Sequence, residues 1–254
     1  VEHARSLGIP VIVTDHHLPG DTLPAAEAII NPNLRDCNFP SKSLAGVGVA
    51  FYLMLALRTF LRDQGWFDER GIAIPNLAEL LDLVALGTVA DVVPLDANNR
   101  ILTWQGMSRI RAGKCRPGIK ALLEVANRDP QKLAASDLGF ALGPRLNAAG
   151  RLDDMSVGVA LLLCDNIGEA RVLANELDAL NQTRKEIEQG MQVEALTLCE
   201  KLERSRDTLP GGLAMYHPEW HQGVVGILAS RIKERFHRPV IAFAPAGDGT
   251  LKGS

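Results

Sequence analysis

The residues best suited to chemistry in this chain are Asp15, His16 and His17, which follow one another directly. Residues 10–13, just before them, are apolar and β-branched, and this pattern predicts a buried strand of a parallel sheet. Since ligands of open α/β sheets bind beyond the carboxyl ends of the strands, the three side chains are expected at a binding edge. One carboxylate and two imidazoles suit Mn, Mg, Zn or Fe. An aspartate that caps the turn beside two histidines with ordinary hydrogen bonds is the alternative, and the tripeptide alone leaves both open.

A second candidate ligand is Asp91, the single carboxylate in the apolar stretch of residues 88–95. Burying an unpaired carboxylate costs free energy, so this side chain needs a cation, a metal ion or several hydrogen-bond donors. Structural hydrogen bonding and metal ligation both meet that need, and the residue alone does not separate them. The preceding segment predicts a helix over residues 77–86 that is capped by Asn76 and ends at Gly87.

Residues 143–154 place Arg145, Asn147 and Arg151 among glycines and alanines. We expect this segment to be a loop whose small residues let the backbone approach a ligand closely. Arginine forks bind phosphates through two hydrogen bonds, so the segment favours a phosphate site. In the alternative, the arginines pair with the two aspartates that close the segment.

The last part of the chain predicts a second α/β unit, in which a loop precedes a helix. His221 and Gly223 lie in that loop, at the amino terminus of the helix, where backbone N–H groups favour an anion. The predicted elements are a strand at residues 213–216, a helix at 224–235 and a returning strand at 239–243.

A long helix separates these two parts of the sequence. It is predicted over residues 168–206 from apolar positions at near-heptad spacing, and its length suits a connector between domains. A dimerising coiled coil is the weaker alternative, because Arg184 and Glu194 interrupt the seam. We therefore expect an α/β protein. It has a parallel-sheet domain with a helical subregion over residues 1–167, then the helix, then a second, smaller α/β domain over residues 207–254.

Composition places the chain among ordinary globular proteins. Its 254 residues are 46% hydrophobic and 22% charged, and the net charge of −3 provides no overall basic field for nucleic acid. A basic groove within a neutral protein remains compatible with these values. Four scattered cysteines without a C-x-x-C pair indicate a reducing cytoplasm, and without a run of 18 apolar residues we expect no membrane span.

Taken in order, these segments resemble the DHH phosphoesterase superfamily. Residues 15–17 match its naming motif, and residues 87–91 match the motif of a later metal-binding aspartate. Residues 145–151 are similar to the arginine–asparagine motif of the branch formed by exonucleases specific for single-stranded DNA. Residues 221–226 resemble the second, DHH-associated domain known as DHHA1, so the likeness covers essentially the whole chain.

The resemblance implies a hydrolase that digests single-stranded DNA from 5′ to 3′ with two divalent cations, Mn or Mg. It implies that His16 and Asp91 are metal ligands. Asp15 is implied as a further ligand or as the group that orients an imidazole, and His17 as the residue beside the scissile phosphate. Arg145, Asn147, Arg151, His221 and Gly223 are implied as the residues that hold DNA phosphates.

The resemblance also implies roles in DNA recombination and repair. Single-stranded DNA is the expected ligand, a single-stranded-DNA-binding protein and a helicase are the expected partners, and the protein is expected to be a cytoplasmic monomer without membrane attachment. Two alternatives stay open. One is another DHH enzyme, such as an oligonucleotide phosphodiesterase or a pyrophosphatase. The other is a non-catalytic replication scaffold, against which the clustered ligands argue.

Two departures from the family pattern affect the expected activity. The family's amino-terminal Asp-x-Asp motif and a further aspartate, which supply most remaining metal ligands, do not occur here. The Gly-Arg-Ser segment expected for the DNA end phosphate is also missing, since the chain stops at Gly253 and Ser254. Because the chain also starts without Met inside a predicted βαβ unit, we expect a fragment with part of an active site and no nuclease activity alone.

Overall fold

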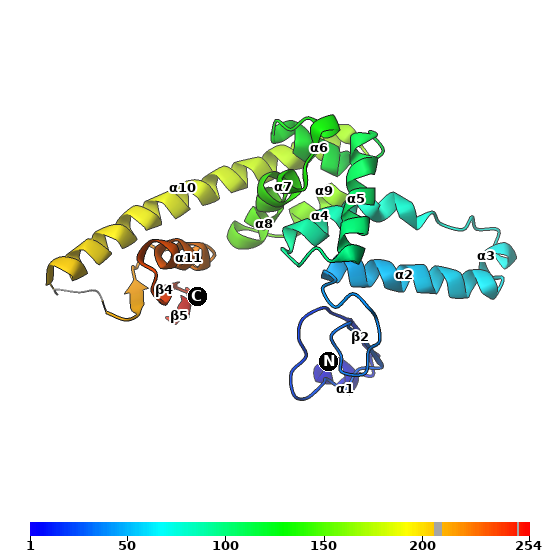
Figure 1. Cartoon of the computed structure of the whole chain (residues 1–254), viewed down its shortest axis with the longest axis horizontal. Coiled ribbons are helices and arrows are strands. Elements are labelled where there is room, and N and C mark those ends of the chain that lie inside the picture. Colours follow the sequence, from blue (N-terminus) through cyan, green and yellow to red (C-terminus); the bar gives the residue numbers. More distant parts are fainter. Residues whose placement is uncertain (206–209, 248) are drawn as a thin grey trace. The chain divides into compact units, whose positions relative to one another are not determined.

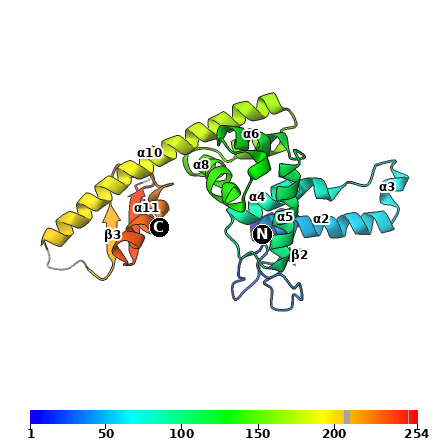
Figure 2. The same ribbon diagram turned by 45° about the horizontal axis from the view of Figure 1, so that its top comes forward.

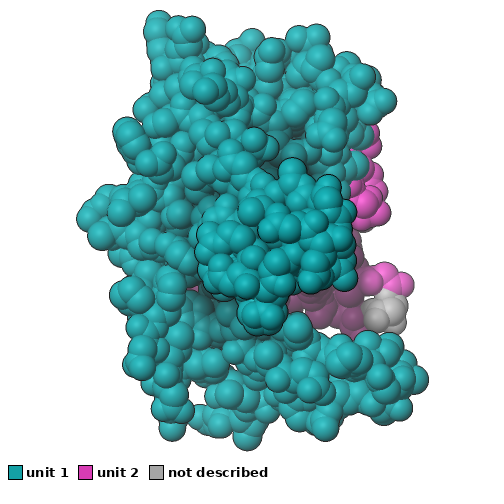
Figure 3. Space-filling view, turned by 90° about the vertical axis from the view of Figure 1, so that its right-hand side faces the viewer, with its two compact units in different colours: residues 1–144, 160–174 teal, residues 145–159, 175–254 magenta. Residues whose placement is uncertain are grey.

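A computed structural model describes residues 1–205, 210–247 and 249–254 (Figure 1). The chain forms two compact units, coloured separately in Figure 3. Unit 1 comprises Val1–Pro144 and Ala160–Ala174, and unit 2 comprises Arg145–Val159 and Asn175–Ser254. Each unit is described by itself below. The α/β class expected from the sequence is confirmed, because both units combine helices with parallel strands.

Unit 1 opens with a helix and a small parallel sheet. Helix α1 (Glu2–Ser6) leads to strand β1 (Ile12–Thr14), which pairs with β2 (Ala28–Ile30) in parallel, with Ile12 opposite Ala28. The predicted parallel strand is therefore confirmed, but the prediction that it is buried is wrong. Among the described residues β1 pairs with β2 alone, and Ile12 is 65% exposed.

The rest of unit 1 is mainly helical. Its elements are α2 (Gly46–Asp63), α3 (Trp66–Glu69), η1 (Leu77–Leu80), α4 (Leu81–Ala90), α5 (Ala97–Arg111), α6 (Pro117–Val125), η2 (Pro130–Lys132), α7 (Ala135–Asp137) and the π-helix η3 (Leu138–Leu142). Helices α4 and α5 are packed so tightly that a Cβ on Gly106 would lie 2.1 Å from the carbonyl oxygen of Leu81. Glycine at this crossing is a packing requirement.

The segment around α4 agrees with the sequence prediction at its start and differs from it at its end. Asn76 caps the segment as expected, since its side chain accepts a hydrogen bond from the backbone N–H of Ala78. The helix does not end at Gly87 but continues to Ala90. A Cβ on Gly87 would lie 2.7 Å from Cγ1 of Val47, so this glycine allows α2 to approach α4 instead of ending the helix.

Unit 2 combines helices with a three-stranded sheet. Strand β3 (Leu213–Tyr216) pairs in parallel with β4 (Val240–Pro245), which pairs in antiparallel fashion with β5 (Leu251–Gly253). The core of this unit joins Met191 and Cys199 of α10 to Met215 of β3 and to Leu228 of α11. Figure 2 shows α11 and β3 beside the second half of α10. The helices that contribute to this unit are α8 (Gly143–Leu152), α9 (Ser156–Leu163), α10 (Ile167–Ser205) and α11 (Val225–Phe236).

The long helix α10 is confirmed, with 39 residues. Arg206, the predicted last residue of this helix, lies outside the described residues. The predicted domain bounds stay a prediction, as does the role of the helix as a connector. Of the helices formed by described residues, none is long and apolar enough to cross a membrane.

The expectation of a loop over residues 143–154 is wrong, because α8 occupies most of this segment. Leu146, Ala148 and Ala149 are buried, so one face of the helix belongs to the core. A Cβ on Gly150 would lie 3.5 Å from the sulfur of Met155. The small residues therefore serve close helix packing, which a local sequence pattern does not distinguish from a flexible loop.

Candidate functional site

The loop after β1 and the end of α4 bring His16 and Asp91 together in unit 1. Nε2 of His16 lies 3.3 Å from Oδ2 of Asp91. The imidazole is 17% exposed and the carboxylate 40% exposed, so the expectation that Asp91 is buried is wrong. The physical reason is its position at the carboxyl end of α4, where the chain turns toward solvent. The carboxylate is nonetheless directed at an imidazole, as a shared ligand site requires.

Asp15 organises the loop through one oxygen. Its Oδ1 accepts hydrogen bonds from the backbone N–H of His16 at 2.7 Å and of His17 at 3.2 Å. It also accepts one from Nδ1 of His17 at 2.7 Å. The side-chain hydrogen bond from His17, followed by the backbone ones, holds the pKa of Asp15 below its usual value. An ionised carboxylate only accepts hydrogen bonds, so Nδ1 carries a proton here and Nε2 of the 77% exposed ring is the atom left for proton exchange.

Two asparagines after β2 hold the histidine loop in place. Nδ2 of Asn33 donates to the carbonyl oxygen of His16 at 2.7 Å, and Nδ2 of Asn31 donates to that of His17 at 2.9 Å. Oδ1 of Asn31, which is buried, accepts from the backbone N–H of Asn33. None of the candidate site residues named from the sequence lies in this Asn-Pro-Asn segment. An asparagine on each side of a proline was the available signal that side-chain amides are needed at this position.

Helix α2 begins beside His16. A Cβ on Gly46, the first residue of α2, would lie 3.5 Å from Cδ2 of His16, an ordinary van der Waals distance. The start of α2 is therefore a neighbour of the ring that faces Asp91. This positioning of one imidazole and one carboxylate suits a divalent cation, since such ions accept nitrogen and oxygen donors together.

The donor set is nevertheless incomplete in the described part of the chain. Within residues 1–205, 210–247 and 249–254, no group of three or more His, Cys, Asp or Glu side chains is arranged to hold a metal ion. His16 and Asp91 form a pair, while Asp15 is engaged with His17. The residues therefore fit part of a metal site, as the missing aspartate motifs would predict.

The basic residues of α8 lie in unit 2 and have partners far away in the sequence. Nε of Arg145 lies 2.8 Å from Oδ1 of Asp178, and the arginine side chain is only 12% exposed. Nη1 of Arg151 donates to the carbonyl oxygen of Gly223 at 3.2 Å. Asn147 is exposed on the same helix. The alternative drawn from the sequence paired the arginines with the two aspartates that close the segment. Neither aspartate is among the partners named here.

The predicted anion site at the start of α11 lies directly against Arg151. A Cβ on Gly223 would lie 2.1 Å from the carbonyl oxygen of Arg151 and 3.2 Å from Cε1 of His221. Nδ1 of His221 accepts a hydrogen bond from the backbone N–H of Gly223 at 3.1 Å. The structure therefore brings together three of the five predicted phosphate-binding residues within unit 2.

A cavity of about 450 Å³ extends this group along α11. It contains two guanidinium groups and two hydroxyl groups, a donor set suited to phosphate. The sequence analysis missed Ser230 and Arg231, and their i, i+4 spacing from Gly226 and Ile227 was the available signal. The lining residues are Arg151, Gly226, Ile227, Ser230, Arg231 and Ser254.

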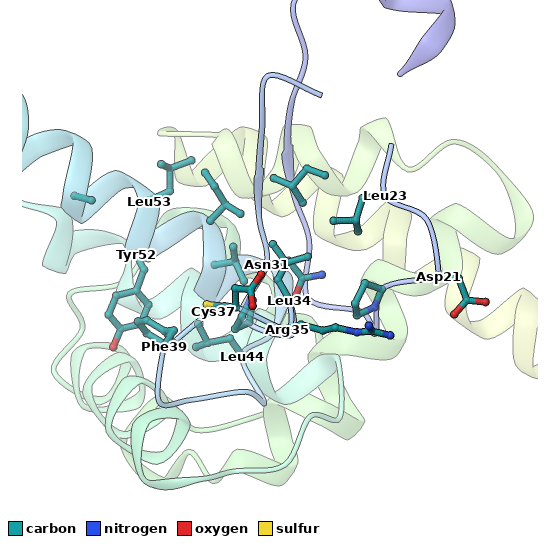
Figure 4. A pocket seen from close by; sticks show the side chains of 18 residues that line it. Asp21, Leu23, Asn31, Leu34, Arg35, Cys37, Phe39, Leu44, Tyr52 and Leu53 are labelled. Atoms are coloured by element: carbon teal, nitrogen blue, oxygen red, sulfur yellow. The ribbon is translucent and has the colours of Figure 1, made fainter. Parts of the chain in front are cut away.

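A larger cavity of about 870 Å³ lies in unit 1 and is mainly apolar (Figure 4). Phe39, Leu44 and Tyr52 form part of its wall, and so does Asn31, whose side chain also donates to the carbonyl oxygen of His17. Neither the histidines nor Asp91 line it. This cavity therefore adjoins the candidate site through Asn31 but is separate from it.

The predicted site residues fall into two groups, one in each unit. The metal and proton-transfer candidates of unit 1 are Asp15, His16, His17 and Asp91, and the phosphate candidates of unit 2 are Arg145, Asn147, Arg151, His221 and Gly223. Within unit 1 the candidates meet around one loop, and within unit 2 a cavity adjoins Arg151. The roles assigned to all nine residues stay predictions.

Known proteins resemble this chain in sequence and in fold. Residues 1–88 match the family described as "DHH family, N-terminal domain". The whole chain is 99% identical to the single-stranded-DNA-specific exonuclease RecJ of Escherichia coli (strain K12), of which it covers 44%. A crystal structure of exonuclease RecJ bound to manganese is 36% identical, with a TM-score of 0.76 over 96% of this chain and 57% of the other. A RecJ structure from Thermus thermophilus in complex with Mg²⁺ is 36% identical, with a TM-score of 0.71 over 93% of this chain and 33% of the other.

The chain thus spans less than half the length of the curated relative that it matches at 99% identity. The match extends from its first residue to its last, and the fold agrees over nearly the same range. By sequence, by fold and by its DHH segment, the chain is similar over its whole length to part of RecJ.

Proposed function

We propose that the chain forms part of a metal-dependent exodeoxyribonuclease that digests single-stranded DNA from 5′ to 3′ during recombination and repair. The observation that carries this proposal is the 3.3 Å separation between Nε2 of His16 and Oδ2 of Asp91. The two residues come from distant parts of the sequence, one after a strand and one at a helix end. The chain's RecJ relatives include proteins crystallised with Mn²⁺ and Mg²⁺, which supports the same metals here.

In this proposal His16 and Asp91 each provide one ligand to a divalent cation, Mn or Mg. When bound, a pair of such cations supplies Lewis-acid stabilisation of the attacking and leaving oxygens of an in-line displacement. Asn33 keeps His16 in place, since its side chain holds the carbonyl oxygen of that residue. Asp91 needs no such support, because the last turn of α4 fixes its backbone.

His17 is proposed to act on the scissile phosphate. Asp15 holds Nδ1–H of this ring, and the ring is largely exposed, so Nε2–H can pass a proton to the leaving oxygen when the imidazole carries protons on both nitrogens. The lowered pKa of Asp15 keeps the carboxylate ionised at neutral pH, which maintains the hydrogen bond that orients the ring. Asp15 in this account positions His17, and a role as metal ligand is the alternative.

Arg145, Asn147, Arg151, His221 and Gly223 are proposed to hold DNA phosphates from unit 2. The support is the cavity that adjoins Arg151 and contains a second guanidinium group, that of Arg231. Binding through phosphates carries no base readout, which fits an exonuclease that acts without sequence preference. Ser230 and Ser254 add hydroxyl donors to the same cavity.

We also propose that this chain alone is not a competent nuclease. Among its described residues no group of three or more His, Cys, Asp or Glu side chains joins the His16–Asp91 pair, and the chain covers 44% of the relative from E. coli. The remaining ligands are proposed to lie in the part of the relative that this chain does not span. The proposed domain bounds are residues 1–167, 168–206 and 207–254, with the protein acting as a cytoplasmic monomer beside a single-stranded-DNA-binding protein and a helicase.

A substrate comparison tests the proposal. Full-length E. coli RecJ is incubated with Mn²⁺ and long single-stranded DNA, duplex DNA or dinucleotides, and the purified 254-residue chain is treated in parallel. We expect digestion of the long single strand by the full-length protein and none by the chain alone. Preference for dinucleotides would contradict the assigned substrate, and Mn²⁺-dependent digestion by the chain would contradict its incompleteness.

A further inference from the structure

Phe140 is an exposed aromatic side chain in an otherwise buried segment. It lies in the π-helix η3, where Leu138, Ala141 and Leu142 are buried, yet Phe140 itself is 85% exposed. Burial of a phenylalanine stabilises a fold, and within this chain, which covers 44% of its E. coli relative, the ring of Phe140 gains no such burial. π-helical segments are rare and occur frequently at functional sites.

The π-helix lies against the last turn of α4, the helix that precedes Asp91. A Cβ on Gly139 of η3 would lie 3.3 Å from Cγ1 of Val89, and a Cβ on Gly143, which directly follows η3, would lie 3.4 Å from Cβ of Ala90. These two contacts place η3 alongside the two residues that precede Asp91. All of these residues belong to unit 1, so Phe140 lies on an element that packs against the helix end next to Asp91.

Val92, the residue after Asp91, has an unusual backbone. Its φ is 60°, in the left-handed region that β-branched residues rarely adopt, and it is 85% exposed. Such backbone strain is found mainly where the surrounding structure serves ligand binding or catalysis. A second apolar side chain is therefore presented to solvent beside the same carboxylate, at a local energetic cost.

We propose that Phe140 is a stacking platform for a nucleobase of the single-stranded substrate, next to the His16–Asp91 pair. The inference rests on the proposed function, since the ligand is the same DNA strand whose phosphate the pair would hold. Phosphate groups do not favour an apolar ring, whereas an unpaired base has a free π-face that does. Every base has such a face, so stacking adds affinity without sequence preference, while the bases of a duplex are already stacked on one another.

The test measures DNA affinity in full-length E. coli RecJ with substitutions at the equivalent positions. Kd is measured by fluorescence anisotropy without divalent cations, so that no cleavage occurs. We expect Phe140→Ala to weaken binding of a single-stranded oligonucleotide about fivefold to 150-fold, the range of one lost base stack. Phe140→Trp, which restores a π-face, is expected to bind as tightly as the unsubstituted protein. The matched control is Trp104→Ala, which removes a 60% exposed aromatic ring from α5.

An abasic oligonucleotide of equal length separates stacking from a structural role. Removal of the bases should abolish the difference between Phe140→Ala and the unsubstituted protein, because no base remains to stack. An equal loss on abasic DNA, an equal loss in Trp104→Ala, or unchanged affinity in Phe140→Ala would overturn the inference. A change in oligomeric mass on substitution of Phe140 would also overturn it in favour of a protein contact. Cleavage by Asp91→Ala is measured separately. If cleavage is lost in this variant while the binding results contradict base stacking, the proposed function stands and only this inference fails.

Discussion

Nε2 of His16 and Oδ2 of Asp91 lie 3.3 Å apart, which joins the loop after β1 to the end of α4 at a single point. Nothing in the local sequence of either residue requires this meeting. It depends on α2, whose first residue is Gly46 and whose Val47 packs against Gly87 of α4. The candidate centre is therefore a product of helix packing, and substitutions that leave its two side chains intact can still disturb it.

The first prediction concerns Asn33, whose side chain donates to the carbonyl oxygen of His16 at 2.7 Å. Asn33→Ala in the full-length protein should lower kcat on single-stranded DNA by about 10- to 100-fold, as expected when a group that orients a metal ligand is removed. The fold should remain intact, which circular dichroism checks. Asn33→Asp is the informative companion, because it keeps the shape but removes the N–H donor, and it should show a similar loss. Normal turnover in either variant would argue against this role.

The second prediction concerns Arg145, which is 12% exposed and paired with Asp178. Arg145→Ala should lower the free energy of unfolding by about 1.5–3 kcal/mol, because a hydrogen bond to a charged group is lost and Asp178 is left without this partner. Urea unfolding of the chain measures this change. If stability is unchanged while DNA binding is lost, Arg145 serves the substrate alone and the structural assignment is wrong.

The third prediction concerns Arg151, for which we expect the opposite behaviour to that of Arg145. Arg151 is exposed, so Arg151→Ala should change the free energy of unfolding by no more than about 0.5 kcal/mol. It should weaken binding of single-stranded DNA, and the slope of log Kd against log salt should fall by about 0.7, the value for one lost phosphate contact. An unaltered salt slope in a titration from low to high salt would show that Arg151 makes no phosphate contact.

The fourth prediction uses glycine positions. A Cβ on Gly223 would lie 2.1 Å from the backbone oxygen of Arg151, so Gly223→Ala forces backbone to move and should destabilise unit 2 by about 1–3 kcal/mol. Faster hydrogen exchange in α11 would report this. Gly190→Ala is the control, since Gly190 is exposed in α10 with nothing within 4 Å, and should stabilise the chain by about 0.5–1 kcal/mol. Equal effects of both substitutions would contradict the packing argument.

The fifth prediction concerns pH and the ion pair between Glu124 and Arg171. Nε of Arg171 lies 2.7 Å from Oε2 of Glu124, and the hydrogen bond from Arg171 lowers the pKa of this carboxyl. A lowered folded-state pKa means that the contribution to stability is full above the ordinary value of 4.5 and is lost as pH falls through the folded-state value. Thermal midpoints of Glu124→Gln and the unsubstituted chain should differ slightly at pH 7 and converge below pH 4.5. A difference that persists unchanged in acid would exclude this cause.

Much of the fold was predictable because local patterns carry it. The parallel pairing of β1, the strand β3 and the long helix α10 each follow from hydrophobic periodicity and turn residues. Asn76 was identified as a cap from its residue type alone, and the structure confirms the hydrogen bond. These features depend on residues that are neighbours in the sequence.

Features that depend on distant contacts were not predictable in the same way. Gly87 is typical of a helix end, but here it faces Val47, so α4 continues to Ala90. The glycines and alanines of α8 were interpreted as a loop because nothing local indicates which partner they pack against. In each case a small residue is compatible with two local structures, and only the residue that it contacts in the folded chain decides between them.

In the candidate site, too, local features were predictable from the sequence and contacts between distant segments were not. Asp15 was expected either to bind a metal or to orient an imidazole, and its carboxylate lies within hydrogen-bond distance of His17, two residues away. The exposure of Asp91 was not anticipated, because an apolar stretch suggested burial, whereas the residue lies at a helix end. The supporting amide of Asn33 was missed, since its target is the backbone of a residue on another segment.

The central claim is that His16 and Asp91 form part of a divalent-metal centre that hydrolyses DNA, and one measurement tests it most directly. The turnover of full-length E. coli RecJ carrying Asp91→Ala at the equivalent position is measured on single-stranded DNA with Mn²⁺, together with Kd for the same DNA. Substitution of groups that only orient a ligand costs about 10- to 100-fold, so loss of a ligand should lower kcat by at least about 100-fold. Kd should remain close to that of the unsubstituted protein. Near-normal turnover in this variant would contradict the account.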